Sequence, residues 1–217
     1  MKFPKAIAIL GAVAVIIPTF SVSAQTVSRF TNNGNEYVVI DGIEANTRVS
    51  LQLDSQDLVR RSRGNACGWI RISNSASYPL PSAIQISEDS GETYGTSIDV
   101  TSLNTESIRC QNGVILNGDG TNTPPSGNFK DSSGAVVIPG KVQNQQYSVK
   151  YVGTPASSSG NANACGFRQV SHSPTRNRDL TSFTYDGTSY NLTSLTEANP
   201  PLCRRVGDSY VRYEEKP

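Results

Sequence analysis

Four cysteines and one histidine are the side chains that could do redox, metal or nucleophilic chemistry in this chain of 217 residues. Two of the cysteines stand in a repeated string, which reads NACGW at 65–69 and NACGF at 163–167. No two cysteines are close enough for a CxxC pair, and one histidine leaves a zinc site without clustered ligands. Four cysteines allow three pairings. The repeat favours the one in which each copy closes its own bond, Cys67–Cys110 and Cys165–Cys203.

The only histidine, His172, lies in the stretch SHSPTRNRD, and the matching position of the other copy is Asn74. A catalytic triad needs a base that a carboxylate orients. Ser171, Ser173 and Asp179 are near in sequence, but the stretch is typical of a loop, so we expect a surface histidine. The chain has no G-x-S-x-G elbow, no HExxH helix and no phosphate-binding glycine loop.

Acidic and amide side chains gather at two further places. SEDSGET holds the densest acidic cluster, which we expect to be a solvated turn rather than a glycosidase pair: Glu88, Asp89 and Glu92. NGDGTN has the alternate spacing of a calcium loop, but the bidentate acid expected further on is missing, so we expect a linker: Asn117, Asp119 and Thr121. Asn191 begins a glycosylation sequon, which matters only in a host that glycosylates asparagine this way.

A basic patch formed by Arg60, Arg61 and Arg63 lies in LVRRSRGN, directly before the first repeated string. The second copy reads SSSGN at the matching place. Because a patch on one copy only is not demanded by a shared fold, it indicates a contact with an acidic polysaccharide or another partner. A solvated loop is the alternative.

The N-terminus has the pattern of a secretory signal peptide over residues 1–24. Two lysines precede an apolar stretch that contains Pro18, and Val22-Ser23-Ala24 places small residues where a signal peptidase reads. Cleavage after Ala24 removes two lysines and no acid, which changes the formal net charge from +1 to −1. A near-neutral chain has no global field for nucleic acid or an anionic membrane. We expect a secreted protein, extracellular or at the cell surface, with the periplasm as an alternative.

The chain is an internal duplication at a shift of 98 residues. VVIDGIEANTRVSLQL at 38–53 matches VVIPGKVQNQQYSVKY at 136–151, and the same shift aligns NACGW with NACGF. Further on, GTSIDVTSL at 95–103 matches GTSYNLTSL at 187–195. Each copy is too long to be a solenoid unit that needs its neighbours, so we expect each to fold as a domain.

The elements that must position these residues alternate apolar and polar side chains, as half-buried strands do. The expected fold is all-β, with two tandem related β-sandwich (immunoglobulin-like) domains that hold one disulfide each. Asp186-Gly187 predicts a two-residue hairpin, and residues 54–62 could form one or two helical turns. The expected divisions are a signal peptide at 1–24, an arm or extra edge strand at 25–35, domain 1 at 36–116, a Gly/Pro/Ser linker at 117–133 and domain 2 at 134–217.

No cofactor, metal or catalytic residue is predicted, and we expect a protein that is not an enzyme. The leading hypothesis is a structural or adhesive protein of the cell surface or an extracellular filament, with itself or a surface polysaccharide as partner. Strand addition by the arm could drive assembly. The alternative is a pair of carbohydrate-binding modules that use tyrosines as stacking platforms: Tyr78, Tyr94, Tyr185 and Tyr190.

Overall fold

The structure is a computed structural model that describes residues 25–88, 93–118, 125–176 and 178–214. The predicted signal peptide at 1–24 lies outside the described residues. Within these ranges the only helices are two short 3-10 turns, η1 (Pro174–Arg176) and η2 (Leu192–Ser194), and all other regular elements are strands. The all-β fold class is therefore confirmed.

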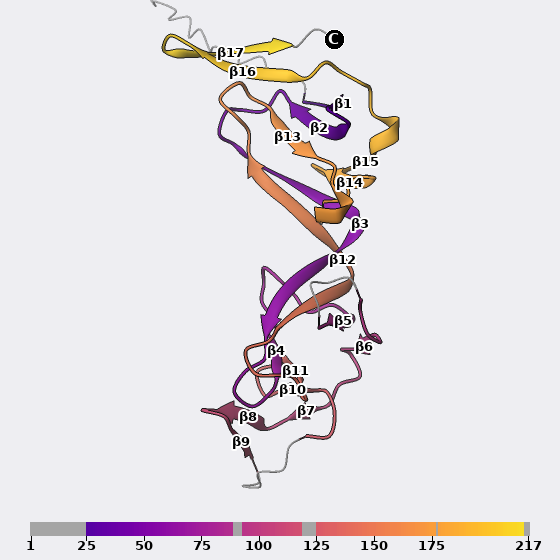
Figure 1. Cartoon of the computed structure of the whole chain (residues 1–217), viewed down its shortest axis with the longest axis vertical. Coiled ribbons are helices and arrows are strands. Elements are labelled where there is room, and N and C mark those ends of the chain that lie inside the picture. The colour runs from indigo at the N-terminus through magenta and orange to yellow at the C-terminus, as the bar shows by residue number, and fades with distance from the viewer. Residues whose placement is uncertain (1–24, 89–92, 119–124, 177, 215–217) are drawn as a thin grey trace, which may run out of the picture.

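Two strands of sixteen residues cross the middle of the molecule and join two lobes (Figure 1). These strands, β3 (Arg48–Arg63) and β12 (Gln146–Asn161), pair antiparallel along their length. The upper lobe of Figure 1 contains residues 25–53, 156–176 and 178–214, and the lower lobe contains residues 58–88, 93–118 and 125–151. The molecule is consequently elongated, with one lobe at each end of the crossed strands.

The upper lobe packs two sheets and a hairpin. One sheet has the order β15-β14-β3-β12 and the other β1-β2-β13, and the hairpin β16–β17 lies across the second sheet. The bounds are β1 (Thr26–Asn32), β2 (Asn35–Asp41), β13 (Arg168–Ser171), β14 (Ser182–Tyr185), β15 (Thr188–Asn191), β16 (Pro201–Val206) and β17 (Ser209–Glu214).

The lower lobe repeats this plan with the sheet β3-β12-β5-β6, the sheet β4-β11-β10-β7 and the hairpin β8–β9. The bounds are β4 (Ile70–Ile72), β5 (Ala83–Ser87), β6 (Ile98–Asp99), β7 (Thr105–Glu106), β8 (Ile108–Gln111), β9 (Val114–Asn117), β10 (Phe129–Asp131) and β11 (Val136–Ile138). The architecture of both lobes is β-sandwich-like.

Each lobe takes its core from both sequence repeats. In the upper core, Leu51 and Leu53 of the first repeat pack with Val170, Phe183 and Leu192 of the second. In the lower core, residues of 136–151 pack with Ile70 and Ile84 of the first repeat. The N-terminal half of the first repeat thus folds with the C-terminal half of the second, and the N-terminal half of the second folds with the C-terminal half of the first. The two repeats have exchanged their N-terminal halves within one chain. A division into separately folding segments at 36–116 and 134–217 does not describe this arrangement.

The exchange follows from the waist between the lobes, residues 54–57 and 152–155, where the chain stays extended instead of turning back. The ladder pairs Leu53 with Ala156 and Leu58 with Tyr151, with a register shift between. Ala156 is the repeat counterpart of Leu58, so a strand that turned back at 54–57 would meet the same side-chain pattern. Both arrangements put the same types of residue on the same faces of the sheet. The hydrophobic pattern therefore does not distinguish the exchanged arrangement from two separately folded repeats. The helical turns expected at 54–62 are wrong, since this segment is strand.

The repeated VVI run, at 38–40 and 136–138, is explained by the layers of each lobe. Val38 and Ile40 point into the upper core, whereas Val39 points to the opposite face, where it packs against Phe30 and Phe167. Val137 does the same against Trp69 and Phe129 in the lower lobe. A strand that is buried on both faces reads as a continuous apolar run instead of an alternating one.

The segments expected to be an arm and a linker both contain strands of the sandwiches. Residues 26–32 pair along their full length with β2, so the edge-strand alternative holds and the mobile arm is wrong. Within the expected linker at 117–133, β10 pairs with β11 and Phe129 is 2% exposed. Phe30 and Phe129 occupy matching places beside the two disulfides. Each repeat therefore begins with this hairpin.

Candidate functional site

The repeated NACG string forms the same closed turn in both lobes. Asn65 accepts hydrogen bonds at Oδ1 from the backbone N–H of Cys67 and of Trp69, both at 3.0 Å. Asn163 does so from Cys165 and Phe167, at 3.0 and 3.2 Å. The asparagine thus pairs two backbone donors that the strand ladder leaves unused, which explains why its side chain recurs.

The glycine of this turn lies against the other repeat. Gly68 has φ +71° and Gly166 φ +77°, values that disfavour a side chain. A Cβ on Gly68 would lie 2.7 Å from the carbonyl oxygen of Lys141, and a Cβ on Gly166 would lie 2.5 Å from that of Ile43. The backbone N–H groups of Lys141 and Ile43 in turn donate to the two glycine carbonyls. The string therefore ties each half-repeat to its exchanged partner.

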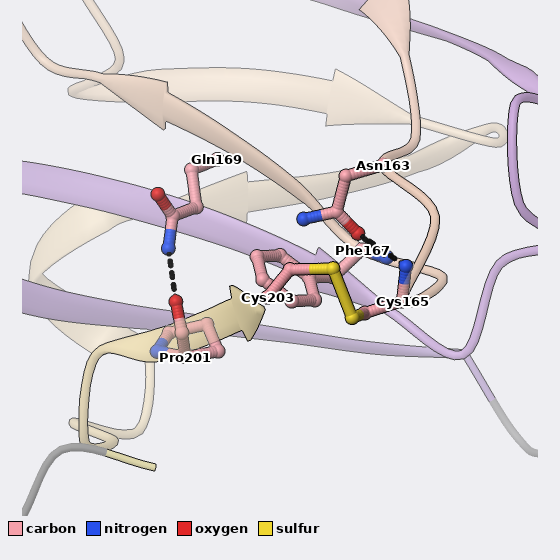
Figure 2. The surroundings of a disulfide bond; sticks show 6 residues. All are labelled: Asn163, Cys165, Phe167, Gln169, Pro201 and Cys203. Carbon is pink, nitrogen blue, oxygen red and sulfur yellow. Dashed lines mark hydrogen bonds between the residues drawn. A yellow bond between two sulfur atoms is a disulfide. The ribbon is translucent and has the colours of Figure 1, made fainter. Parts of the chain in front are cut away.

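Both predicted disulfides are present, and the described residues include no free cysteine. Figure 2 shows Phe167 beside the Cys165–Cys203 bond, and Trp69 is 4% exposed beside Cys67. The aromatic residue two positions after the first cysteine therefore packs beside the disulfide in both lobes. Gln169 donates to the carbonyl oxygen of Pro201 at 2.7 Å and fixes the outer hairpin (Figure 2). Two disulfides indicate an oxidising environment outside the cytoplasm.

His172 is half-buried at the end of β13 and not on the surface as expected. Its Nδ1 accepts a hydrogen bond from the backbone N–H of Leu180 at 3.0 Å and lies 3.8 Å from Asp179 Oδ1. Burial alone would raise the pKa of Asp179, but hydrogen bonds from Thr181 outweigh it, so the pKa lies below its ordinary value. Because its acceptor nitrogen binds the backbone of Leu180, His172 holds the loop between β13 and β14 in place.

The other residues singled out in the sequence either make structural contacts or lie outside the described residues. Asn191 accepts from the N–H and the Oγ of Thr193, so the sequon caps η2, and Asp99 makes the same pair of bonds to Thr101. Glu88 pairs with Lys141 at 3.1 Å. The remaining acids of the SEDSGET cluster and most of the candidate calcium loop lie outside the described residues: Asp89, Glu92, Asp119 and Thr121. Among the described residues no group of His, Cys, Asp or Glu could hold a metal ion.

The arginine patch lies on an edge strand of the lower lobe. Residues 58–63 of β3 pair with β12 on one side, and no described strand pairs with them on the other. Arg61 and Arg63 are exposed and Arg60 is half-buried. Basic side chains on a sheet edge oppose pairing with another chain, which gives the outward arginines a structural explanation independent of any ligand.

A cavity of about 300 Å³ lies at the open side of the lower sandwich, where the edge strands β3 and β4 face each other. The sequence did not group these residues, because three strands and the loop after β4 supply them. The lining side chains are Arg60, Arg61, Ser62, Arg71, Ile72, Ser73, Ser75, Val149 and Tyr151. The structure thus brings two of the three predicted arginines to one cavity and adds Arg71.

Two contacts hold Arg60 in this cavity. Its guanidinium lies 4.5 Å from the ring centre of Tyr78, and its Nη1 donates to the Tyr151 hydroxyl at 3.3 Å. Arg71 donates from Nε to Asp131 at 2.7 Å and from Nη1 to Ser73 Oγ. Arg60 is consequently positioned before any ligand arrives, whereas each guanidinium nitrogen of Arg71 already has a protein partner, its Nη2 donating to Ser133 Oγ at 2.7 Å.

Within the described part of the chain, Asp131 is the one carboxylate that pairs with these arginines, and it stands in the tight turn before β11. Burial acts to raise its pKa, but hydrogen bonds from Ser133, Arg71 and Ala135 lower it below the ordinary value. Because Asp131 already accepts from both the Nε of Arg71 and the turn, it leaves Arg60 and Arg61 uncompensated.

The upper lobe has a buried arginine that sequence reasoning missed. Arg168, which matches Ile70, is 9% exposed and donates from Nη1 to the carbonyl oxygens of Val49 and Ser158, at 2.6 and 3.0 Å. Burial and the nearby Arg178 lower its pKa. The sequence did contain a signal for this buried arginine, because Arg168 stands where the other copy has the apolar Ile70. Its partners are backbone atoms, so it braces the sandwich.

Of the four tyrosines proposed as sugar platforms, Tyr78 alone is exposed as a large hydrophobic side chain, at 45%. Tyr94 lies under the Lys150 ammonium, and Tyr190 stacks on Phe183. Tyr185 donates to Gln25. The four rings therefore do not form matching platforms on the two lobes.

No helix in the part of the chain that the structure describes is long and apolar enough to cross a membrane. No family model, no curated protein and no solved structure matches this chain.

Proposed function

We propose that this chain is an extracellular, non-catalytic structural or adhesive protein of a cell surface or filament. The observation that carries the proposal is the pair of strands β3 and β12, each of which belongs to both lobes. The two cores are coupled through two shared strands, whose antiparallel ladder has a register shift at the waist, instead of through a Gly/Pro/Ser linker. A body of this kind holds its two ends at a fixed separation, which suits spacing and display.

The first and the last described strands belong to the same lobe. Thr26 begins β1 and Glu214 ends β17, and both lie in the upper lobe (Figure 1). The arginine cavity belongs to the other lobe, where its lining residues Arg60 and Tyr151 lie close to the waist. That the two sandwiches are immunoglobulin-like remains a prediction.

Assembly by the segment at 25–35 has less support, because β1 pairs with β2 on one side and is bridged at Arg29 to Glu197 on the other. The better edge is the upper half of β12, residues 156–161, which pairs with β3 on one side and has no described strand on the other. Its sequence ASSSGN holds no charge that would oppose strand addition.

The test is immunogold electron microscopy of the native host, together with fractionation of its envelope and medium. The proposal predicts label on the envelope or on extracellular fibres, and a protein with no free thiol. Label confined to the cytoplasm, or native protein with reduced cysteines, would contradict it.

Glycan binding is the second candidate, and the geometry favours it for the lower lobe alone. The observation behind it is the exposed Tyr78 ring next to a cavity with arginine and serine donors. A matched pair of modules on both lobes lacks such support.

A further inference from the structure

We propose that the cavity between β3 and β4 binds the carboxylate or sulfate group of an acidic polysaccharide. The inference deepens the glycan-binding candidate, and it rests on that candidate and not on the structural role. The site consists of Arg60 and Arg61 from the edge of one sheet, Arg71 from the edge of the other, and the hydroxyls between them.

The charge balance of the cavity calls for an anion. Among the described residues three arginines and no acid line it. Asp131 pairs with Arg71 and with its own turn, so it compensates that arginine but neither Arg60 nor Arg61. Arg60 contacts the neutral Tyr78 and Tyr151 side chains, and Arg61 is exposed. A guanidinium binds an oxyanion through two parallel hydrogen bonds, and Arg60 is the arginine that the ladder turns into the cavity. Arg61, opposite Ser148, adds positive charge from the other face of the strand. Arg71 already donates from Nε, Nη1 and Nη2 to Asp131, Ser73 and Ser133.

The direction in which Arg60 points shows that this side chain does not serve to keep other strands from the sheet edge. Arg60 is paired in the ladder with Val149, which is 1% exposed in the lower core. Directly opposite residues of an antiparallel pair share a face of the sheet, so Arg60 points inward at the open side of the sandwich. An arginine that only guarded the edge would point outward into solvent.

The second repeat shows that the fold does not need these charges. The residues that match Arg60 and Arg61 are Ser158 and Ser159, and Arg71 is matched by Gln169. The arginine next to Ser158 in that lobe, Arg168, is satisfied by backbone carbonyls and by the Ser158 hydroxyl at 3.0 Å. The three cavity arginines are therefore specific to one lobe.

The lining favours a sugar as the carrier of the anion. Ser62, Ser73 and Ser75 present hydroxyls around the arginines, and hydroxyls both donate and accept, as sugar hydroxyls require. Tyr78 adds an exposed ring at the same place. Nucleic acid would need a track of basic groups along repeated phosphates, whereas the chain carries 19 basic against 18 acidic residues.

The test measures binding of the full mature chain to four probes by isothermal titration calorimetry at physiological salt. The probes are an oligogalacturonate, a heparin oligosaccharide, neutral dextran and poly-glutamate. The variant is Arg60→Gln with Arg61→Gln. The control removes two exposed charges elsewhere, Arg48→Gln with Arg204→Gln, of which Arg48 lies on the same strand in the other lobe.

We expect one or both acidic sugars to bind and dextran not to bind. The cavity variant should weaken that binding about tenfold or more, because charge-assisted hydrogen bonds are lost, while the control stays within about twofold. A second variant, Arg60→Lys with Arg61→Lys, keeps the charge, and we expect an intermediate loss since the forks are gone.

No binding of either acidic sugar, or equal losses in the cavity variant and the control, would overturn the site. Binding of poly-glutamate as tightly as the sugars would overturn the sugar assignment. Thermal melts of each variant verify folding, and if the glutamine variant fails to fold, the lysine variant decides the question. None of these outcomes changes where the protein is found in its host, so a failure here is distinct from a failure of the structural role.

Discussion

Substitution of Gly68 by alanine tests how tightly the repeated string is pressed against the exchanged half-repeat. Gly68 has φ +71°, and an alanine Cβ there would lie 2.7 Å from the carbonyl oxygen of Lys141. The left-handed backbone costs an alanine about 1–2 kcal/mol. The close approach adds about 1–3 kcal/mol, because backbone must shift to admit the methyl group. The expected loss of unfolding free energy is therefore about 2–5 kcal/mol.

Gly134→Ala is the matched control, because Gly134 lies in the same lobe with φ +80° and an alanine Cβ there would meet no atom within 4 Å. It should lose only the backbone contribution of about 1–2 kcal/mol. Guanidinium unfolding with the disulfides intact, followed by the fluorescence of Trp69, measures both variants, since Trp69 is the only tryptophan and is buried in this lobe. Equal losses for the two variants would refute the close approach.

The contacts of single side chains give three further predictions. Replacing Cys67 and Cys110 by alanine should cost about 4 kcal/mol in the chain-entropy model, measured by chemical unfolding, because the bond closes a separation of 43 residues; a loss under about 1 kcal/mol would argue against it. Arg168→Met should lower stability by about 2–4 kcal/mol, because two buried carbonyls lose their donor, and an unchanged melting temperature would contradict the bracing role. The lowered pKa of Asp131 means that the folded state holds its proton more weakly than the unfolded chain, so its contribution is present above about pH 4 and lost as pH falls through the folded pKa. Asp131→Asn should therefore flatten the acid side of the stability curve, and an unaltered curve would count against that carboxylate.

Local features were predictable wherever both copies carry the same residues. The disulfide pairing followed from a cysteine placed twice in matching strings. Asp186-Gly187 predicted the hairpin β14–β15, and both residues have positive φ. In each case the chemistry is contained in a few neighbouring residues, so no tertiary context was needed.

The exchange of half-repeats could not be predicted from the same information. Leu53 meets Ala156 in the structure, and it would meet the matching residue Leu58 if the strand turned back. The pattern of buried and exposed positions is the same in both arrangements, because the repeats are alike. The choice depends on the conformation of two tetrapeptides, 54–57 and 152–155, for which hydrophobic periodicity gives no signal.

The cavity was predictable only in part. Arg60 and Arg61 stood out because the second copy lacks them, but Arg71 and Tyr151 come from other strands. Whether Arg60 points inward depends on the register of β3 against β12, which in turn depends on the exchange. Side chains that converge through long-range pairing leave no local pattern in a single sequence.

An engineered disulfide distinguishes the exchanged arrangement from two separately folded repeats. Ser50 and Ser159 lie opposite each other on β3 and β12, with their hydroxyl oxygens 2.9 Å apart. Opposite residues of an antiparallel pair have the separation that a disulfide needs. In two separately folded repeats, Ser50 would instead face Arg61, the counterpart of Ser159. In the exchanged structure these two residues are eleven positions apart on one strand, about 36 Å.

The measurement is peptide mapping of two unreduced full-length variants, Ser50→Cys with Ser159→Cys and Ser50→Cys with Arg61→Cys. We predict a bond between positions 50 and 159 in the first variant, and free thiols at 50 and 61 in the second. A bond between 50 and 61, together with free thiols at 50 and 159, would contradict the exchanged architecture.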